Sequence, residues 1–235
     1  PNMASSVTGD DLNLRLAMYY ALDNDAIATA MGSSYAPLKS LGTAYFQDYN
    51  PEWEKEETYV NTYDLDLAKE YLEKSDYNGE EIIIVGLVNE ECKNAMTMMQ
   101  SLLAQAGIKA TIQTYEESLM NPIIAEKTGW DFVVTRLGGS TLVASWNTLF
   151  NNDVHDGMTT NWLDDPKLQE LYQTSLADET HDDEHVKACM DYAFSIGDVY
   201  PISGMASSIV YSKKMEEIYY REGYVTVGSS KYQGQ

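Results

Sequence analysis

Apolar residues recur along the chain at two different spacings, and these spacings predict alternating helices and strands. In segments 11–31, 64–79 and 91–106 they return at the spacing of a helix with one buried face. Segments 81–88 and 108–115 are short runs rich in β-branched residues, which is typical of buried strands. The strand, helix and strand between 81 and 115 therefore predict a βαβ unit with a right-handed crossover.

Further apolar runs extend this prediction to the rest of the chain. Asp64 and Asp165 each stand at a favoured helix start, and Asp165 is followed by a proline. A helix over 116–127 leads into a third strand over 130–137, and residues 202–211 predict a last strand. The order of elements indicates an α/β fold in which a mixed sheet is flanked by helices.

Two stretches depart from regular periodicity. The helical pattern of 11–31 is expected to break near Asp23. Segment 32–61 carries glycine, serine, proline and scattered aromatic residues without a sustained spacing, so it predicts a long loop. We expect the aromatic residues of this loop to pack in the core.

The charge of the chain excludes some classes of partner. With 37 acidic and 15 basic residues, the formal net charge is -22. Nucleic acids and anionic membrane surfaces are recognised by clusters of lysine and arginine, so neither is an expected partner. The acidity is explained by solubility. Cys92 and Cys189 are far apart and form no CxxC pair, which argues against a zinc ribbon and a disulfide-rich scaffold.

The loop after the third predicted strand, Gly138-Gly139-Ser140, is where an α/β protein would carry ligand groups. It lacks the second glycine of a GxSxG nucleophile elbow, and the chain contains no GxGxxG or phosphate-loop motif. His181 and His185 flank three acids in an order that differs from HExxH, and a solvated acidic helix start explains them as well. We therefore expect no catalytic residue, no metal and no cofactor, and a hydrolase built on Ser140 is disfavoured.

Several short motifs follow one another in an order that is more specific than any one of them. In this order they resemble the C-terminal lobe of the peptide/nickel (family 5) extracellular solute-binding proteins of ABC importers. The resemblance covers nearly the whole chain. It rests on Arg15, Ala17, Ala21 and Asp23, on Tyr63, Asp64, Ala68 and Lys69, on Gly107-Ile108 and Trp130-Asp131, on Asp165, Leu168, Leu171 and Tyr172, and on Tyr200-Pro201-Ile202.

The resemblance implies a lobe of the periplasmic-binding-protein type. Residues 1–214 would form the C-terminal solute-binding lobe, and 215–235 a tail that returns to a missing first lobe. In that family two lobes close on a peptide, a metal chelate or another small solute, and the complex docks on an ABC permease. We therefore expect a monomeric, non-enzymatic, extracellular binding protein, either periplasmic or held at the cell surface as a lipoprotein. The alternative is a ligand-sensing or interaction module built on the same lobe.

The same resemblance places the candidate ligand site. Its residues are expected to be Arg136, Leu137, Gly138, Gly139, Ser140 and Trp146, with Tyr35 and Trp162 as weaker candidates. Ser140 stands where the peptide binders carry an aspartate for the ligand's ammonium group, and Val134 replaces a basic residue. Losing a charged partner removes an interaction of about 1.5–3 kcal/mol, so a peptide ammonium is not expected at Ser140. Arg136 could clamp a ligand carboxylate or pair with a surface acid.

Overall fold

The structure is a computed structural model, and the chain divides in it into two compact units, residues 1–204 and 205–235, which are taken separately below. The boundary expected from the sequence, after residue 214, stays a prediction. The structure describes residues 1–43, 46–55, 63–136, 138, 141–151, 165–178, 183–205, 212–217, 220–221, 224–225 and 231–232.

The first unit begins with two consecutive helices, α1 (Leu12–Ala21) and α2 (Asn24–Met31). The side chains of Asp11 and Asp23 accept hydrogen bonds from backbone N–H groups in the first turns of these helices. An aspartate at this position satisfies a donor that the helix itself leaves free, so Asp23 starts a new helix and does not continue α1. The expected break near Asp23 is confirmed.

A three-stranded sheet in the order β3-β2-β4 forms the centre of this unit. It consists of β2 (Ile82–Leu87), β3 (Ala110–Tyr115) and β4 (Phe132–Val134), with Ile84 of β2 opposite both Ile112 and Phe132. The helix α4 (Glu90–Ala106) connects β2 to β3, which confirms the βαβ unit. The α/β fold class is therefore confirmed.

The last strand expected from the sequence lies in a different sheet. β5 (Ser203–Met205) pairs with β1 (Tyr35–Pro37) and not with the three-stranded sheet. Within the described residues every pair of the three-stranded sheet is parallel, so the expected mixed sheet is corrected to a parallel one. β1 and the short 3-10 helix η1 (Pro51–Lys55) lie in the segment 32–61 that was predicted as a loop. The sequence did not indicate them, because elements this short leave no periodic pattern.

Two of the remaining helices, α3 and α8, begin where their capping residues predict. Asp64 and Asp165 cap α3 and α8 by accepting hydrogen bonds from backbone N–H groups of the first turn, as expected. The remaining helices are α3 (Leu65–Lys74), α5 (Glu117–Ala125), α6 (Leu142–Ser145), α7 (Asn147–Phe150), α8 (Pro166–Ala177) and α9 (Asp183–Ser195).

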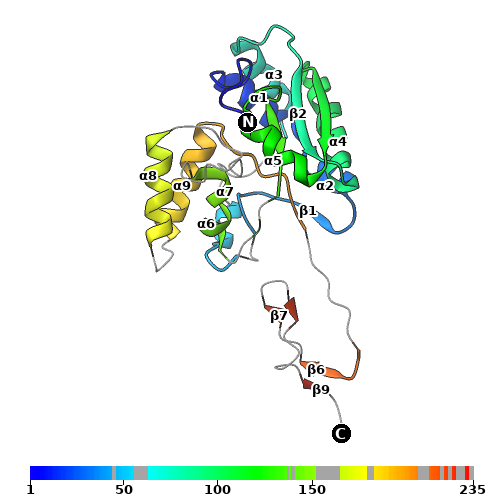
Figure 1. The fold of residues 1–235 in the computed structure, drawn as a ribbon, viewed down its shortest axis with the longest axis vertical. Helices are drawn as coiled ribbons and strands as arrows, with labels where there is room; N and C mark the ends of the chain where they lie inside the picture. The colour runs from blue at the N-terminus through cyan, green and yellow to red at the C-terminus, as the bar shows by residue number, and fades with distance from the viewer. Residues whose placement is uncertain are drawn as a thin grey trace. The chain divides into compact units, whose positions relative to one another are not determined.

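Two large hydrophobic clusters, called core A and core B below, hold the first unit together. Core A lies between the three-stranded sheet and helices α1 to α4, and it contains the methionine stripe of α4, so Met96 and Met99 are core residues. Core B joins helices α6 to α9 to Leu41, Tyr49 and Trp53 from segment 32–61. Figure 1 shows α8 and α9 side by side, apart from α4 and β2.

A third and smaller cluster covers the opposite face of the sheet. Met120 and Ile124 of α5 pack there against Val85 of β2 and against Trp130, which precedes β4. The sheet is therefore covered on both faces, as parallel sheets generally are.

In the second unit the described residues include two short antiparallel pairs of strands. β6 (Met215–Glu217) pairs with β9 (Lys231–Tyr232), and β7 (Tyr220–Arg221) pairs with β8 (Tyr224–Val225). No helix among the described residues of either unit has the length and apolar character needed to cross a membrane.

Candidate functional site

The carboxyl ends of β2 and β4 lie side by side at one edge of the parallel sheet. After β2, the side chain of Asn89 caps α4 by accepting a hydrogen bond from the Cys92 N–H at 2.9 Å. After β4, Thr135 and Arg136 are exposed to solvent. Loops that leave this end of parallel strands carry the ligand groups of α/β proteins, so we take residues 88–92, 135, 136 and 138 as the sheet-edge site.

Arg136 and Cys92 come together at this edge although they are distant in sequence. Burial raises the pKa of the Cys92 thiol, and a hydrogen bond with the backbone of Leu87 and the positive charge of Arg136 oppose that rise. Cys92 is 8% exposed and Arg136 is exposed, so the guanidinium is the part of the pair that a ligand can reach. Among the residues that the structure describes, no carboxylate forms an ion pair with Arg136.

The far end of the loop after β4 is fixed by a residue from another part of the chain. The carboxylate of Asp48 accepts hydrogen bonds from the N–H groups of Leu142 (2.5 Å) and Val143 (3.1 Å) at the start of α6. Thr141 adds a local cap by accepting from the Ala144 N–H at 3.2 Å. Asp48 is buried, with 5% of its surface exposed, so the loop after β4 ends at a firmly held position.

The predicted loop residues divide into those that the structure describes and those that it does not. Gly138 is exposed, and a Cβ added there would meet no atom within 4 Å. Leu137, Gly139, Ser140 and Trp162 lie outside the described residues. Their part in a ligand site stays a prediction, as does that of Arg136 and Gly138.

Neither Trp146 nor Tyr35 is exposed at the sheet-edge site. Trp146 is fully buried in core B, where its ring meets that of Phe150 at 5.6 Å in an edge-to-face arrangement, and its indole N–H has no hydrogen-bond partner in the described part of the chain. Tyr35 is partly buried in β1, which belongs to the other sheet. In this structure Trp146 therefore presents no surface to a ligand, and a binding role for either residue stays a prediction.

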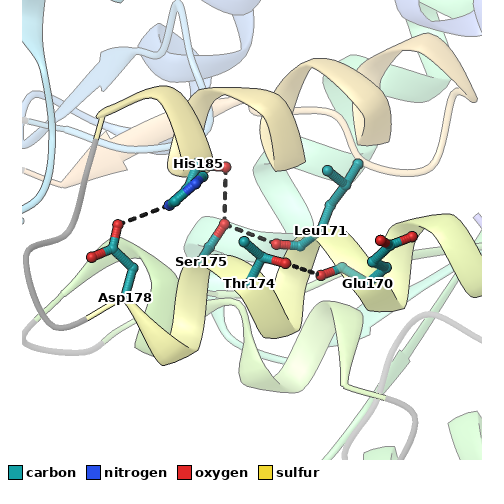
Figure 2. A network of polar contacts seen from close by, with 6 residues as sticks. All are labelled: Glu170, Leu171, Thr174, Ser175, Asp178 and His185. Carbon is teal, nitrogen blue, oxygen red and sulfur yellow. Dashed lines mark hydrogen bonds and ion pairs between the residues drawn. The ribbon is translucent and has the colours of Figure 1, made fainter.

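A serine, a histidine and an aspartate meet between α8 and α9, but they do not form a hydrolytic triad. Figure 2 shows that the Ser175 hydroxyl donates to the backbone carbonyls of Leu171 and His185, both at 2.9 Å. The imidazole Nδ1 of His185 faces Asp178 Oδ2 at 2.8 Å. The ring therefore does not contact the serine hydroxyl, and general-base activation requires that contact.

The same region contains the histidine pair considered above as a metal site. His185 is described, whereas His181 and its neighbour Asp182 lie outside the described residues. In the described ranges no three His, Cys, Asp or Glu side chains are arranged to hold a metal ion. Cys92 and Cys189 are free and buried, 8% and 0% exposed.

Sequence reasoning missed three residues of the sheet-edge site and its support. Asn89 follows a predicted strand and precedes a predicted helix, so the preference of asparagine for helix N-caps could have identified it. Cys92 lies one turn into the same helix and could have been placed from that cap. Asp48 acts on a helix 94 residues away, and no local pattern signals such a contact.

One comparison with known proteins shows the family of the chain. Residues 2–157 match the family model described as bacterial extracellular solute-binding proteins, family 5 Middle. A search of curated proteins gives no match. The chain is similar in fold to HbpA2 from Haemophilus parasuis, with a TM-score of 0.82 at 17% identity over 96% of this chain and 46% of that one.

Two further solved structures carry bound molecules. A dipeptide-binding protein from Pseudoalteromonas sp. SM9913 in complex with Met-Leu has a TM-score of 0.76 at 19% identity, over 99% of this chain and 47% of that one. NikA from Brucella suis in complex with Fe(III)-EDTA has a TM-score of 0.72 at 16% identity, over 97% and 49%. At these identities the likeness shows the fold, and the chain spans about half the length of these proteins.

Proposed function

The chain belongs to family 5 of the bacterial extracellular solute-binding proteins, and we propose that it is one lobe of the substrate-binding component of an ABC importer. In this proposal a peptide or another small polar solute is held by closure of two lobes, of which this chain supplies the second. The family match supports binding as the function, and the coverage of about half of each solved relative supports a single lobe.

The observation that carries the proposal is the exposed Arg136 at the carboxyl end of β4, beside the start of α4. A guanidinium offers a planar pair of donors that matches a carboxylate, and Arg136 has no such partner among the described residues. We propose that Arg136 binds an anionic or strongly polar group of the solute. Gly138 and Gly139 would let the backbone approach the ligand, and Leu137 and Ser140 would add an apolar surface and a hydroxyl.

The proposed partners and location follow from the same family membership. The complete binding protein would work as a monomer outside the cytoplasmic membrane, either periplasmic or anchored as a lipoprotein, and would deliver its solute to an ABC permease without chemical conversion. Tyr35, Trp146 and Trp162 remain proposed contributors. For Trp146 a binding role requires a rearrangement that exposes its ring, since core B now covers it completely.

Calorimetric titration with Met-Leu and with a pool of di- to pentapeptides tests the proposal. The chain by itself is expected to show no micromolar binding, because half of the site belongs to the other lobe. The two-lobed protein is expected to bind a member of the pool, and Arg136→Ala should weaken that binding at least tenfold, since a charge-assisted hydrogen bond contributes about 1.5–3 kcal/mol.

Lys69→Ala is the matched control, because Lys69 is an exposed cation of α3, away from the sheet edge. It should leave the affinity unchanged. Micromolar binding by this chain alone would contradict the two-lobe site, and equal effects of the two substitutions would contradict the assignment of Arg136.

A further inference from the structure

Four segments of the chain connect core A to core B within the first unit, and one of them runs from Trp53 in core B to Leu65 on core A. Of the other three, the first runs from Met31, which packs on core A, to Leu41 in core B, and the second runs from Val134 to Leu142. In the third, the chain passes from core B to core A between two adjacent residues, because Val199 packs on core B and Tyr200 on core A. Any movement of one core against the other must therefore be accommodated in these four segments.

Side chains of α1 and α2 bind the backbone of two of these connections. Tyr19 donates to the carbonyl of Gly197 at 2.6 Å, and a guanidinium nitrogen of Arg15 donates to the carbonyl of Ile196 at 3.0 Å. The amide of Asn24 donates to the carbonyls of Leu38 (3.0 Å) and Pro201 (2.9 Å). We call this contact between α1, α2 and the two connections the inter-core seam.

Some buried polar atoms of the inter-core seam lack a hydrogen-bond partner among the described residues. Arg15 Nε, Asn24 Oδ1 and the Tyr200 hydroxyl are buried and have no hydrogen-bond partner in the described part of the chain. A buried polar atom without a partner costs free energy that it recovers on reaching water. Hydration of these three atoms therefore offsets part of the cost of opening the seam.

A buried carboxylate, Asp198, stands in the third connection, one residue before Val199, and is 4% exposed. The titratable and charged groups that face Asp198 come from several elements. They are Arg15 and Tyr19 of α1, Cys189 of α9, Asp165 at the start of α8 and the amine of Pro1. The Pro1 amine and Arg15 favour the ionised form of Asp198, whereas Asp165 disfavours it. Ionisation of Asp198 therefore changes the electrostatic interactions within the seam.

We propose that the inter-core seam is a proton-controlled hinge, which holds core B against core A while Asp198 is protonated and opens more readily once Asp198 is ionised. The proposal is independent of the proposed solute-binding function. The two are linked only because the loop after β4, which would carry the ligand groups, connects the same two cores.

The sign of the effect follows from the environment of the carboxyl group. Burial raises the pKa of Asp198 from its ordinary value near 3.8 to about 7, although the amine of Pro1 and Arg15 oppose the rise. In an open seam the group returns toward its ordinary value, so the open state releases its proton first as the pH rises. Protection of the closed seam is complete below about pH 4 and is lost progressively as the pH rises from there to about 7.

Amide hydrogen exchange of the 235-residue chain at pH 4 and pH 6, corrected for the intrinsic exchange rates, measures the opening of the seam while the buried amine of Pro1, whose pKa burial lowers to about 6, stays at least half protonated. The opening constant of residues 189–202 is expected to rise at least tenfold between the two pH values, by linkage to the Asp198 proton. The amides of β2 and α4 in core A are expected to change much less. The Asp198→Asn substitution, which keeps the shape and removes the charge, should abolish the rise.

The Glu73→Gln substitution is the matched control, since it removes one negative charge from an exposed position of α3. It should keep the pH effect of the original chain. A rise that persists in Asp198→Asn, or a uniform loss of protection across both cores, would overturn the proposal. If Asp198→Asn fails to fold, direct titration of the Asp198 carboxyl carbon by NMR decides, because an ordinary aspartate pKa would overturn the proposal and a raised one supports it.

Discussion

Core A and core B are both clusters of buried apolar side chains, but they are assembled from the chain in different ways. Core A is built around the consecutive elements β2, α4 and β3, together with helices α1 to α3 that precede them. Core B combines three residues of segment 32–61 with helices that begin only at residue 142. A core made of neighbouring elements can be found from local patterns, whereas one closed over a long loop depends on contacts that no local pattern contains.

The caps of the two helices that border the sheet-edge site show the same contrast. Asn89 caps α4 through the N–H of Cys92, three residues along the chain. Asp48 caps α6 through the N–H groups of Leu142 and Val143 from a distant segment. The start of α4, between β2 and β3, is thus fixed by a neighbouring residue. The end of the loop after β4 is fixed by a contact from a distant segment of the chain.

The largest expected effect comes from truncating the aromatic centre of core B. Trp146→Ala should lower the free energy of unfolding by about 3–5 kcal/mol, the usual cost of removing a buried aromatic ring. Urea titration followed by far-ultraviolet circular dichroism measures it, with Met96→Ala in core A as the counterpart. If the loss from Trp146→Ala were below about 1 kcal/mol, the ring would not be in a packed core.

Removing the long-range cap should cost less. Asp48→Ala leaves two buried N–H groups of α6 without an acceptor and should reduce the free energy of unfolding by roughly 2–3 kcal/mol. Asp48→Asn retains one acceptor oxygen and should show a smaller loss in the same thermal or urea titration. Equal stability of the two variants would argue that the carboxylate does not anchor α6.

The contrast between core A and core B also explains which parts of the fold could be predicted from the sequence. The helices of core A and their caps at Asp23, Asp64 and Gly107 were predictable, because each signal lies within a few residues of the element it ends or begins. The parallel pairing of β2 with β3 was predictable from the βαβ order, whereas the parallel pairing of β4 was not, since a mixed sheet was expected. β1 and the pairing of β5 with it were not, since a strand of three residues is paired by distant contacts.

For the candidate site, the sequence placed Gly138 after the strand that becomes β4, which the order of elements is sufficient to do, but it expected Arg136 inside that strand, which ends at Val134. It did not reveal that the charge of Arg136 acts on the Cys92 thiol, because two strands must first pair to bring the two residues to the same edge. It also favoured Trp146 as a ligand contact, whereas its large apolar ring fills core B. Aromatic residues serve both roles, and only the packing distinguishes them.

A glycine substitution sharpens the comparison at the seam between the cores. Gly197 has φ 63°, and a Cβ there would lie 3.0 Å from Leu12 Cδ1 of α1. Gly197→Ala should destabilise the chain by about 2 kcal/mol, which combines backbone strain with this contact. Gly129→Ala is the control: Gly129 has φ 78° and nothing within 4 Å of an added Cβ, so its loss should be near 1 kcal/mol. Equal losses in thermal unfolding would mean that α1 does not press on the third connection.

The smallest effect is expected at the local cap. Asn89→Ala should lower the free energy of unfolding by about 1 kcal/mol, because the Cys92 N–H loses its acceptor at the start of α4. Since α4 is held in core A along its length, the helix should persist, and only the amides of its first turn should exchange faster with solvent. Asn89→Asp keeps an acceptor and should retain the slow exchange. A loss as large as that of Asp48→Ala would contradict the distinction between a cap that fixes a fold locally and one that joins distant segments.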